Sequence, residues 1–362
     1  MSAFDNFVGT REVSDAHRFD TQALTLWLQA HMPGFAGPLE VEMFKGGQSN
    51  PTYKLNTPSK SYVMRAKPGP VAKLLPSAHA IEREYAVMSG LQGTGVPVAQ
   101  MHVLCDDESV IGRAFYLMEF KQGRVLWDQS LPGMTPSERG AIYDEMNRVI
   151  AALHTVDVSA RGLSDYGRPG SYFERQIGRW TKQYLASVTE PITEMNRLIE
   201  WLPAQMPATA RDESSVSIVH GDFRLDNLIF HPTEPRVIAV LDWELSTLGH
   251  PLADFSYHCM SWHIPPGQFR GIGGLDLVAL GIPSEVDYIR RWCERTAIAT
   301  PEALAQDWNF YLAYNLFRLA AILQGIAKRA LDGTASSAQA GSAGAGARGL
   351  AELAWAFAQR AH

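Results

Sequence analysis

The sequence predicts an α+β fold in which a small antiparallel sheet is followed by a mainly helical part. Residues 39–68 alternate between apolar and polar side chains and contain turn formers, which is typical of short antiparallel strands. Beyond Gly123 the apolar residues recur at the spacing of amphipathic helices. This change of period predicts a bilobal chain, with a sheet-bearing lobe first and a helical lobe second.

The sheet-bearing lobe is predicted to span residues 39–120, after an N-terminal helical extension over residues 1–38. The extension carries one helix, which is expected to begin at Asp20 or Thr21 because these residue types cap helix N-termini. The lobe itself reads as three strands, one helix and two further strands. A glycine-bearing turn joins the first two strands.

The helical lobe is predicted to span residues 121–331. Three strand-like pieces, "SVSIVHGD", "NLIF" and "RVIAVLDWE", interrupt its helices, and the turn "HPTEP" joins the last two. Residues 332–349 are rich in glycine, alanine and serine, so we expect a flexible linker there. Residues 350–362 form a predicted C-terminal helix.

Composition narrows the class of protein. A formal net charge of -6 over 362 residues argues against a general nucleic-acid binder, which needs a basic surface. Cys105, Cys259 and Cys293 lack metal-ligand spacing, so we expect free core thiols. No signal-peptide pattern and no apolar run of membrane-spanning length is visible. We therefore expect a cytoplasmic protein without nucleic-acid or membrane partners; the sequence leaves its oligomeric state open.

The stretch "IVHGDFRLDNLIFHP", followed ten residues later by "LDWE", carries the chemistry. Asp222 sits in a loop at a strand end, where it can reach a substrate hydroxyl. Asn227 and Asp242 offer the hard oxygen ligands that Mg²⁺ prefers. One carboxylate that positions a nucleophile, together with two groups that hold a metal, suits phosphoryl transfer. The plain alternative is that all three are turn and capping residues.

His220-Gly221-Asp222, with Asn227 and Asp242, resembles the catalytic loop and metal-binding aspartate of the aminoglycoside phosphotransferase (APH) family. The resemblance extends over about Val41 to Ala330. It implies a protein-kinase-like, APH-type fold, ATP and Mg²⁺ as cofactors, and a small-molecule hydroxyl as the acceptor. Asp222 would then be the catalytic aspartate, and Asn227 and Asp242 would bind the metal.

The same resemblance assigns a nucleotide site to the sheet-bearing lobe. Arg65 takes the place of the phosphate-binding lysine of kinases, with Lys67 as its rival, and Glu84 takes the place of the helix glutamate that pairs with that cation. Arginine at this place departs from the kinase pattern, although its guanidinium can bind phosphate. The remaining candidates are the covering loop and the connector between lobes, where backbone would meet adenine: Gly46, Gly47, Ser49, Glu119 and Phe120. Without the resemblance, the glycine pair would be a hairpin turn.

Three polar residues, His220, Asp254 and His154, have structural interpretations. His220 belongs to the catalytic motif, but we expect it to brace the loop rather than act as an acid or base. Asp254 is expected to brace the same loop by hydrogen bonds. His154 is expected to be a hydrogen-bonded core histidine. The role of Glu244, as a metal neighbour or as a helix-start residue, stays open.

The acceptor is predicted from charge. The sequence between Ser256 and Ala299 contains four carboxylates and four arginines, so its charge is balanced. A pocket for polycationic aminoglycosides should instead be rich in carboxylates. The longer run around Asp222 is similar to the kinase-like domain fused to certain acyl-CoA dehydrogenases, which implies a hydroxyacyl-CoA or related hydroxy acid. Two alternatives remain: an aminoglycoside phosphotransferase of antibiotic resistance, and a catalytically silent nucleotide-binding module.

Overall fold

The computed structural model of the chain describes residues 9–45, 50–68, 80–168, 170–333 and 340–361, except for the side chains of 340–345. Two compact units make up the chain. The first unit comprises Met1–Trp127, Ser159–Tyr166 and Leu228–Leu245, and the second comprises Asp128–Val158, Gly167–Asn227 and Ser246–His362.

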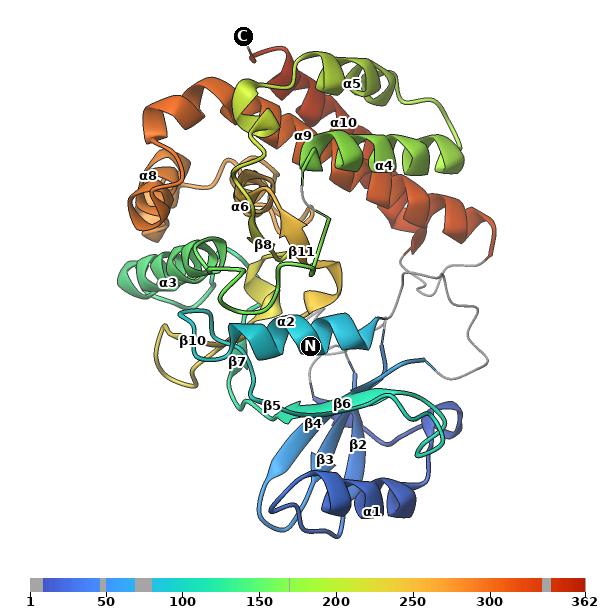
Figure 1. Cartoon of the computed structure of the whole chain (residues 1–362). Helices are drawn as coiled ribbons and strands as arrows, with labels where there is room; N and C mark the ends of the chain where they lie inside the picture. The colour runs from blue at the N-terminus through green and yellow to red at the C-terminus, as the bar shows by residue number, and fades with distance from the viewer. Residues whose placement is uncertain (1–8, 46–49, 69–79, 169, 334–339, 362) are drawn as a thin grey trace. The chain divides into compact units, whose positions relative to one another are not determined.

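A six-stranded antiparallel sheet forms the first unit's main layer (Figure 1), in the order β1-β2-β3-β4-β6-β5. Its strands are β1 (Thr10–Arg11), β2 (Glu40–Phe44), β3 (Thr52–Asn56), β4 (Ser61–Ala66), β5 (Met101–Cys105) and β6 (Phe115–Glu119). The five strands predicted for this lobe are therefore confirmed. The short β1 was not predicted, and it lies inside the expected helical extension.

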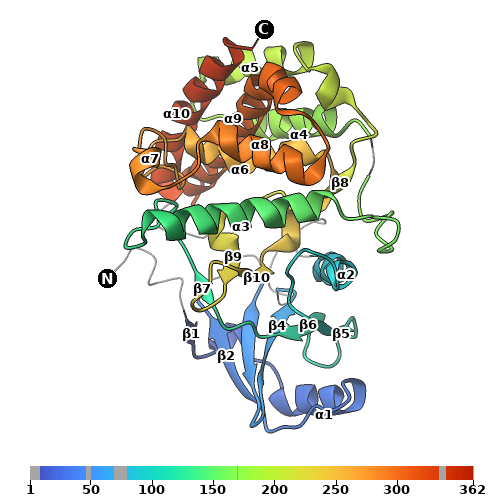
Figure 2. The same cartoon turned by 90° about the vertical axis from the view of Figure 1, so that its left-hand side faces the viewer.

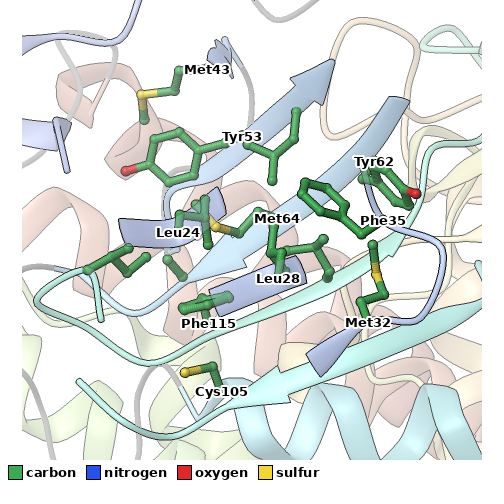
Figure 3. Close-up of a cluster of buried hydrophobic side chains, with 14 residues drawn as sticks. Leu24, Leu28, Met32, Phe35, Met43, Tyr53, Tyr62, Met64, Cys105 and Phe115 are labelled. Carbon is green, nitrogen blue, oxygen red and sulfur yellow. The ribbon is translucent and has the colours of Figure 1, made fainter. Parts of the chain in front are cut away.

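Helix α1 (Thr21–His31) follows a short 3-10 helix, η2 (Asp15–His17), and packs on this sheet. Asp20 caps it by accepting bonds from the amides of Gln22 and Ala23, at 2.9 Å each. Figure 3 shows Leu24 and Leu28 of the helix in one apolar cluster with side chains from the strands. The N-terminal helix thus belongs to the core of the sheet-bearing unit.

Later parts of the chain complete the first unit. Helix α2 (Ile81–Leu91) precedes β5, and a three-stranded sheet combines β7 (Arg124–Val125), β9 (Leu228–Phe230) and β10 (Val237–Val240). This arrangement differs from the predicted boundary at residues 120 and 121. The physical reason is pairing across the sequence: β9 pairs with β7, and the Val240 amide donates to the Pro97 carbonyl at 2.9 Å. The hairpin that precedes Asp242 therefore joins the first unit.

The second unit is mainly helical, as predicted. Its helices are α3 (Pro136–His154), α4 (Tyr172–Ser187), α5 (Thr193–Ala204), α6 (Pro251–Cys259), α7 (Leu277–Leu280), α8 (Glu285–Thr296), α9 (Pro301–Leu331) and α10 (Ala340–Ala358), with 3-10 turns η3 (Ala208–Arg211), η4 (Leu225–Asn227) and η6 (Met260–Trp262). A two-stranded ribbon pairs β8 (Ser217–Val219) with β11 (Thr247–Gly249). Helix α3 packs against α8, and α9 packs against α4, α6 and α10 (Figure 2). The three cysteines are free and buried, as predicted.

The C-terminal helix begins earlier than predicted. Residues 332–349 were expected to be a flexible linker, but α10 starts at Ala340. Alanine is the best helix former, and the glycines among these alanines allow close packing against α9. A Cβ placed on Gly346 would lie 3.1 Å from Leu323 Cδ1, which shows how closely the two helices approach.

Helix α9 corrects the expectation that the chain contains no apolar run of membrane-spanning length. Among the described residues it is the one helix that is long and apolar enough to cross a membrane, with a mean hydropathy of 1.2 over its most apolar window. That window is 78% buried inside the protein. Polar residues such as Asn315, which donates to Ser256 Oγ at 2.7 Å, interrupt the apolar run, so the sequence did not show its length. Burial of this kind is typical of a core helix in a globular unit.

Candidate active site

The loop after β8 is held by a buried carboxylate from α6. Asp254 accepts the amide of His220 on Oδ2 at 2.7 Å and the amide of Gly221 on Oδ1 at 2.8 Å. Gly221 has a φ of +82°, a conformation that favours glycine. The predicted bracing role of Asp254 is therefore confirmed. Because two backbone amides point at one carboxylate, the position of the next residue, Asp222, is fixed.

His154 of α3 supports this brace from behind. Its Nε2 lies 3.3 Å from Asp254 Oδ2, and its Nδ1 accepts the indole N–H of Trp292 at 3.2 Å. The predicted hydrogen-bonded core histidine is thus confirmed. Burial alone would raise the pKa of Asp254, but its bonds with His154 and His220 outweigh that effect, and the pKa is lowered. Asp254 therefore stays ionised inside the protein.

His220 is fully buried next to the loop. Its Nδ1 accepts the amide of Asp222 at 3.2 Å, and its own amide donates to Asp254. A side chain without solvent exposure that bonds the backbone of its own loop has the geometry of a brace. This arrangement agrees with the bracing role expected for His220, although the residue belongs to the predicted catalytic motif.

The Asp222 carboxylate has three side-chain neighbours. Tyr257 of α6 donates its hydroxyl to Oδ1 at 2.6 Å, and the Asn227 amide donates to Oδ2 at 3.1 Å. Arg224 Nη2 lies 3.2 Å from Oδ2. The structure thus brings Asp222 and Asn227 together, as their spacing suggested. Burial and the nearby Asp222 charge raise the pKa of Tyr257, so its hydroxyl remains a donor.

Arg318 of α9 is a contributor that the sequence did not reveal. Its Nη2 donates to the carbonyl of Gly221 at 2.6 Å, and its guanidinium lies 4.8 Å from the Tyr257 ring centroid and 5.4 Å from that of Trp180. Tyr257 follows Asp254 by three residues, a spacing that puts both side chains on one face of α6. For Arg318 no local signal exists, since it lies 97 residues from Gly221 in the chain.

The first unit contains the second group of predicted residues, centred on Arg65 of β4. Arg65 Nε lies 2.9 Å from Glu84 Oε2, and Nη2 lies 3.5 Å from Asp242 and 3.4 Å from Glu244. Lys67 pairs instead with Glu82. The geometry therefore selects Arg65, not Lys67, as the partner of Glu84 and as the cation next to Asp242.

Glu84 is buried on the inner face of α2. It accepts from Asn50 Nδ2 and from the Tyr116 hydroxyl, each at 3.0 Å. Burial raises its pKa, although the Arg65 charge opposes the rise. For Arg65, burial would lower the pKa, but the charge of Glu84 and the other acidic neighbours outweighs burial and raises it. The guanidinium is therefore a permanent cation, fixed by a buried helix residue.

Charge around Arg65 is unbalanced. Among the described residues, three carboxylates approach the Arg65 guanidinium, those of Glu84, Asp242 and Glu244. Asp242 lies two residues after the end of β10 and adopts a φ of +64°, which is uncommon for a residue other than glycine. A surplus of hard oxygen ligands beside one cation fits a divalent metal ion such as Mg²⁺.

Asn227, in the second unit, carries an amide oxygen that can bind a metal ion. Its amide nitrogen is used by Asp222, on the carbonyl at 2.9 Å and on Oδ2 at 3.1 Å. The Oδ1 oxygen is then the atom left to act as a ligand. Within the described ranges no group of three His, Cys, Asp or Glu side chains forms a metal cluster, so the metal role of Asn227 and Asp242 stays a prediction.

The remaining nucleotide candidates lie in two places. Gly46, Gly47 and Ser49 fall outside the described residues. At the end of β6 the Glu119 amide donates to the Gln100 carbonyl at 2.8 Å, so the amide is occupied. The neighbouring Phe120 ring packs on Phe44, with centroids 6.4 Å apart. The adenine role of this connector stays a prediction.

Comparison with known proteins identifies the family. The sequence profile of the phosphotransferase enzyme family (APH) matches residues 40–276. Acyl-CoA dehydrogenase family member 10 of Mus musculus is 46% identical over 354 residues, which cover 97% of this chain and 32% of that protein. The chain therefore spans about a third of the length of this relative.

Solved structures also resemble the chain, and two of them are compared with it by identity and TM-score. A crystal structure from Ralstonia eutropha, described provisionally as an aminoglycoside phosphotransferase, is 64% identical, covers 95% of this chain and 100% of its own, and has a TM-score of 0.87. Aminoglycoside phosphotransferase APH(4)-Ia, solved with ADP and hygromycin B, is 14% identical, covers 92% and 97%, and has a TM-score of 0.59. At that identity the likeness shows the fold alone, and it confirms the predicted kinase-like, APH-type fold. The chain belongs to the phosphotransferase enzyme family.

Proposed function

We propose that the protein transfers the γ-phosphate of ATP to a hydroxyl group of a small molecule. The observation that carries this proposal is the state of Asp222: its loop is fixed by Asp254, and its carboxylate is oriented by Tyr257 and Asn227. A preorganised carboxylate at a strand end is what positioning of an attacking hydroxyl requires. Retention of Asp222, Asn227 and Asp242 favours an enzyme over a silent nucleotide-binding module.

Each residue has a role in the proposed reaction. Asp222 accepts a hydrogen bond from the acceptor hydroxyl, aims its oxygen at the γ-phosphorus and takes its proton as the new P–O bond forms. The bond between that phosphorus and the β,γ-bridging oxygen breaks, and ADP leaves. Arg65, fixed by Glu84, binds phosphate oxygens. Mg²⁺, held by Asn227 and Asp242, would supply positive charge to the ATP phosphates.

We infer that the acceptor is a hydroxyacyl-CoA or a related hydroxy acid. A polycation needs unpaired carboxylates, but the arginines of α8 neutralise the carboxylates next to them. Arg290 pairs with Asp287, and Arg291 and Arg295 pair with Asp144. The curated relatives are named acyl-CoA dehydrogenase family members, which supports an acyl acceptor. The runner-up acceptor is an aminoglycoside, which the names of two structural neighbours favour.

ADP release separates these alternatives. Purified protein with ATP and Mg²⁺ is offered hydroxyacyl-CoA compounds, free hydroxy acids and kanamycin-like aminoglycosides, with Asp222→Asn as the matched inactive control. We expect turnover with the acyl compounds and none with the control. Turnover with aminoglycosides alone would replace the preferred acceptor. Nucleotide binding without turnover on any hydroxyl compound would favour the silent module.

The setting of the reaction is also a proposal. The net charge of -6 and the burial of α9 support a protein that works in the cytoplasm without nucleic acid or membrane. Co-sedimentation with anionic vesicles and a DNA-binding assay at low salt test this, and we expect binding to neither.

A further inference from the structure

A small pocket in the second unit adjoins the proposed catalytic aspartate. Its lining includes Phe223, Arg224, Tyr257, Phe269 and Arg270. Two of these residues, Tyr257 and Arg224, also contact the Asp222 carboxylate, at 2.6 and 3.2 Å. A molecule in this pocket would therefore lie against the side chains that hold Asp222.

Two guanidiniums give the pocket its character. Arg270 Nη2 lies 2.6 Å from Asp226 Oδ2, and Arg224 Nε lies 3.5 Å from Asp226 Oδ1. The two arginines thus converge on one buried carboxylate. Their convergence on a single partner makes this wall of the pocket suited to oxygen atoms that carry negative charge.

Arg270 has unused capacity to donate. In the part of the chain that the structure describes, its buried Nε has no hydrogen-bond acceptor. The residue is also held in a left-handed conformation, with φ of +57°, after Phe269 with φ of +32°. Strained backbone of this kind persists where the surrounding structure enforces it, often at ligand sites. A buried donor without an acceptor, on a strained turn, indicates that a ligand oxygen completes this site.

The rest of the lining contains apolar and aromatic side chains, together with Gln129, His258 and Ser261. Phe223 is fully buried, and Phe269 lies 6.0 Å, ring centroid to guanidinium carbon, from both Arg224 and Arg270. Apolar walls with a few directed polar groups are typical of sites for small organic ligands. A short hydrocarbon chain that bears an acyl oxygen matches both parts of the lining, whereas a polycation would meet two fixed guanidiniums.

We propose that Arg270 determines acceptor specificity by binding the acyl oxygen of a hydroxy acid or of its thioester. This inference rests on the proposed function and names the group by which the acceptor is recognised. The competing interpretation is that Arg270 only braces Asp226 through their ion pair. The two interpretations differ in what they predict for ligands that lack an acyl oxygen.

Three ligands with the same hydroxyl position test the inference: 3-hydroxybutyrate, 3-hydroxybutyryl-CoA and 1,3-butanediol. Dissociation constants are measured by calorimetry for wild type, Arg270→Gln and the matched control Arg290→Gln, which removes an exposed arginine of α8. We expect Arg270→Gln to weaken the acyl ligands about 10–100-fold and to leave the diol unchanged. Arg290→Gln should change none of the three. The first two ligands distinguish a free carboxylate from a thioester carbonyl.

Equal affinity of wild type and Arg270→Gln for both acyl ligands would overturn the inference, as would failure of wild type to bind either of them. If Arg270→Gln does not fold, Arg270→Lys keeps a cation near Asp226 but loses the second donor, and the same loss of acyl selectivity is expected. The proposed function is tested separately by ADP release. If the acyl ligands bind in a way that depends on Arg270 but no ADP is released, the proposed function is refuted and the role of Arg270 in binding stands. If ADP is released but Arg270→Gln leaves the acyl affinity unchanged, the proposed function stands and the role of Arg270 is refuted.

Discussion

The two groups of predicted site residues differ in how their charges are balanced. Around Arg65, in the first unit, three carboxylates share one guanidinium. Around Asp222, in the second unit, one carboxylate receives a hydroxyl, an amide and a guanidinium. The first group has a surplus of negative charge that a metal ion can offset. The second is internally satisfied and rigid, which suits the positioning of a nucleophile.

The largest expected effect comes from the satisfied group. Asp222→Asn keeps the shape of the side chain and can still accept from Asn227, but it cannot take a proton. We expect kcat to fall about 10²–10⁴-fold, the usual contribution of a general base, while the Kd for ATP stays unchanged. Steady-state ADP release and nucleotide titration measure both quantities. Asp287→Asn, at a partly exposed position of α8, is the control. A kcat of Asp222→Asn within tenfold of the wild-type value would disprove the catalytic role.

The unbalanced group should respond through its metal instead. Asp242→Asn removes one of the surplus charges, and asparagine tolerates the φ of +64° found at this position. We expect the Mg²⁺ concentration for half-maximal activity to rise about 10–100-fold. Raising Mg²⁺ should restore much of the rate, which it should not do for Asp222→Asn. An unchanged Mg²⁺ requirement would show that the surplus charge has another purpose.

A smaller effect on the KM for ATP should distinguish Arg65 from Lys67. Arg65→Lys keeps the charge but loses the fork that reaches Glu84 and Asp242 together, so we expect the KM for ATP to rise about tenfold. Lys67→Arg should stay within about twofold, because Lys67 pairs with the partly exposed Glu82. The paired variants are compared in one ATP titration at saturating acceptor. The opposite ranking would reassign the phosphate role to Lys67.

Much of the fold could be predicted because it follows from the local periodicity of apolar and polar residues. Five strands of the sheet, α1 with its Asp20 cap, and the longer helices of the second unit follow from alternation, capping and apolar stripes. Strand β1 has two residues, too few to show alternation. The membership of β9 and β10 in the first unit depends on pairing with β7, which no local pattern records.

The site divides in the same way. Asp222, Asn227 and Asp254 were found because they lie in short polar motifs between apolar runs. The choice of Arg65 over Lys67 required the structure. The two residues are two positions apart, so strand alternation assigns them to the same face, and β4 itself ends at Ala66. Arg318 could not be predicted, because its bond to Gly221 depends on the packing of α9. Local chemistry is visible in sequence, whereas the residues that fix it come from distant elements.

The smallest expected effect concerns acid stability, and it again distinguishes the second unit. Burial lowers the pKa of His258, on α6, to about 4, and the Asp254 charge only partly opposes this. Between about pH 6.5 and 4 the unfolded chain therefore binds a proton that the folded chain does not. Stability is complete above pH 6.5 and falls as the pH falls, by about 0.8 kcal/mol at pH 6 from this residue. Urea unfolding at pH 7.5 and pH 6 measures the difference.

His258→Gln should reduce that pH dependence, because glutamine does not titrate and can still bond the Tyr288 hydroxyl, which lies 2.8 Å from His258 Nε2. His31→Gln, at an exposed position of α1, should leave it unchanged. The direction of the change in unfolding free energy is informative. If the protein became more stable between pH 7.5 and pH 6, His258 would have to be charged in the folded state. The neutral, buried His258 inferred here would then be wrong.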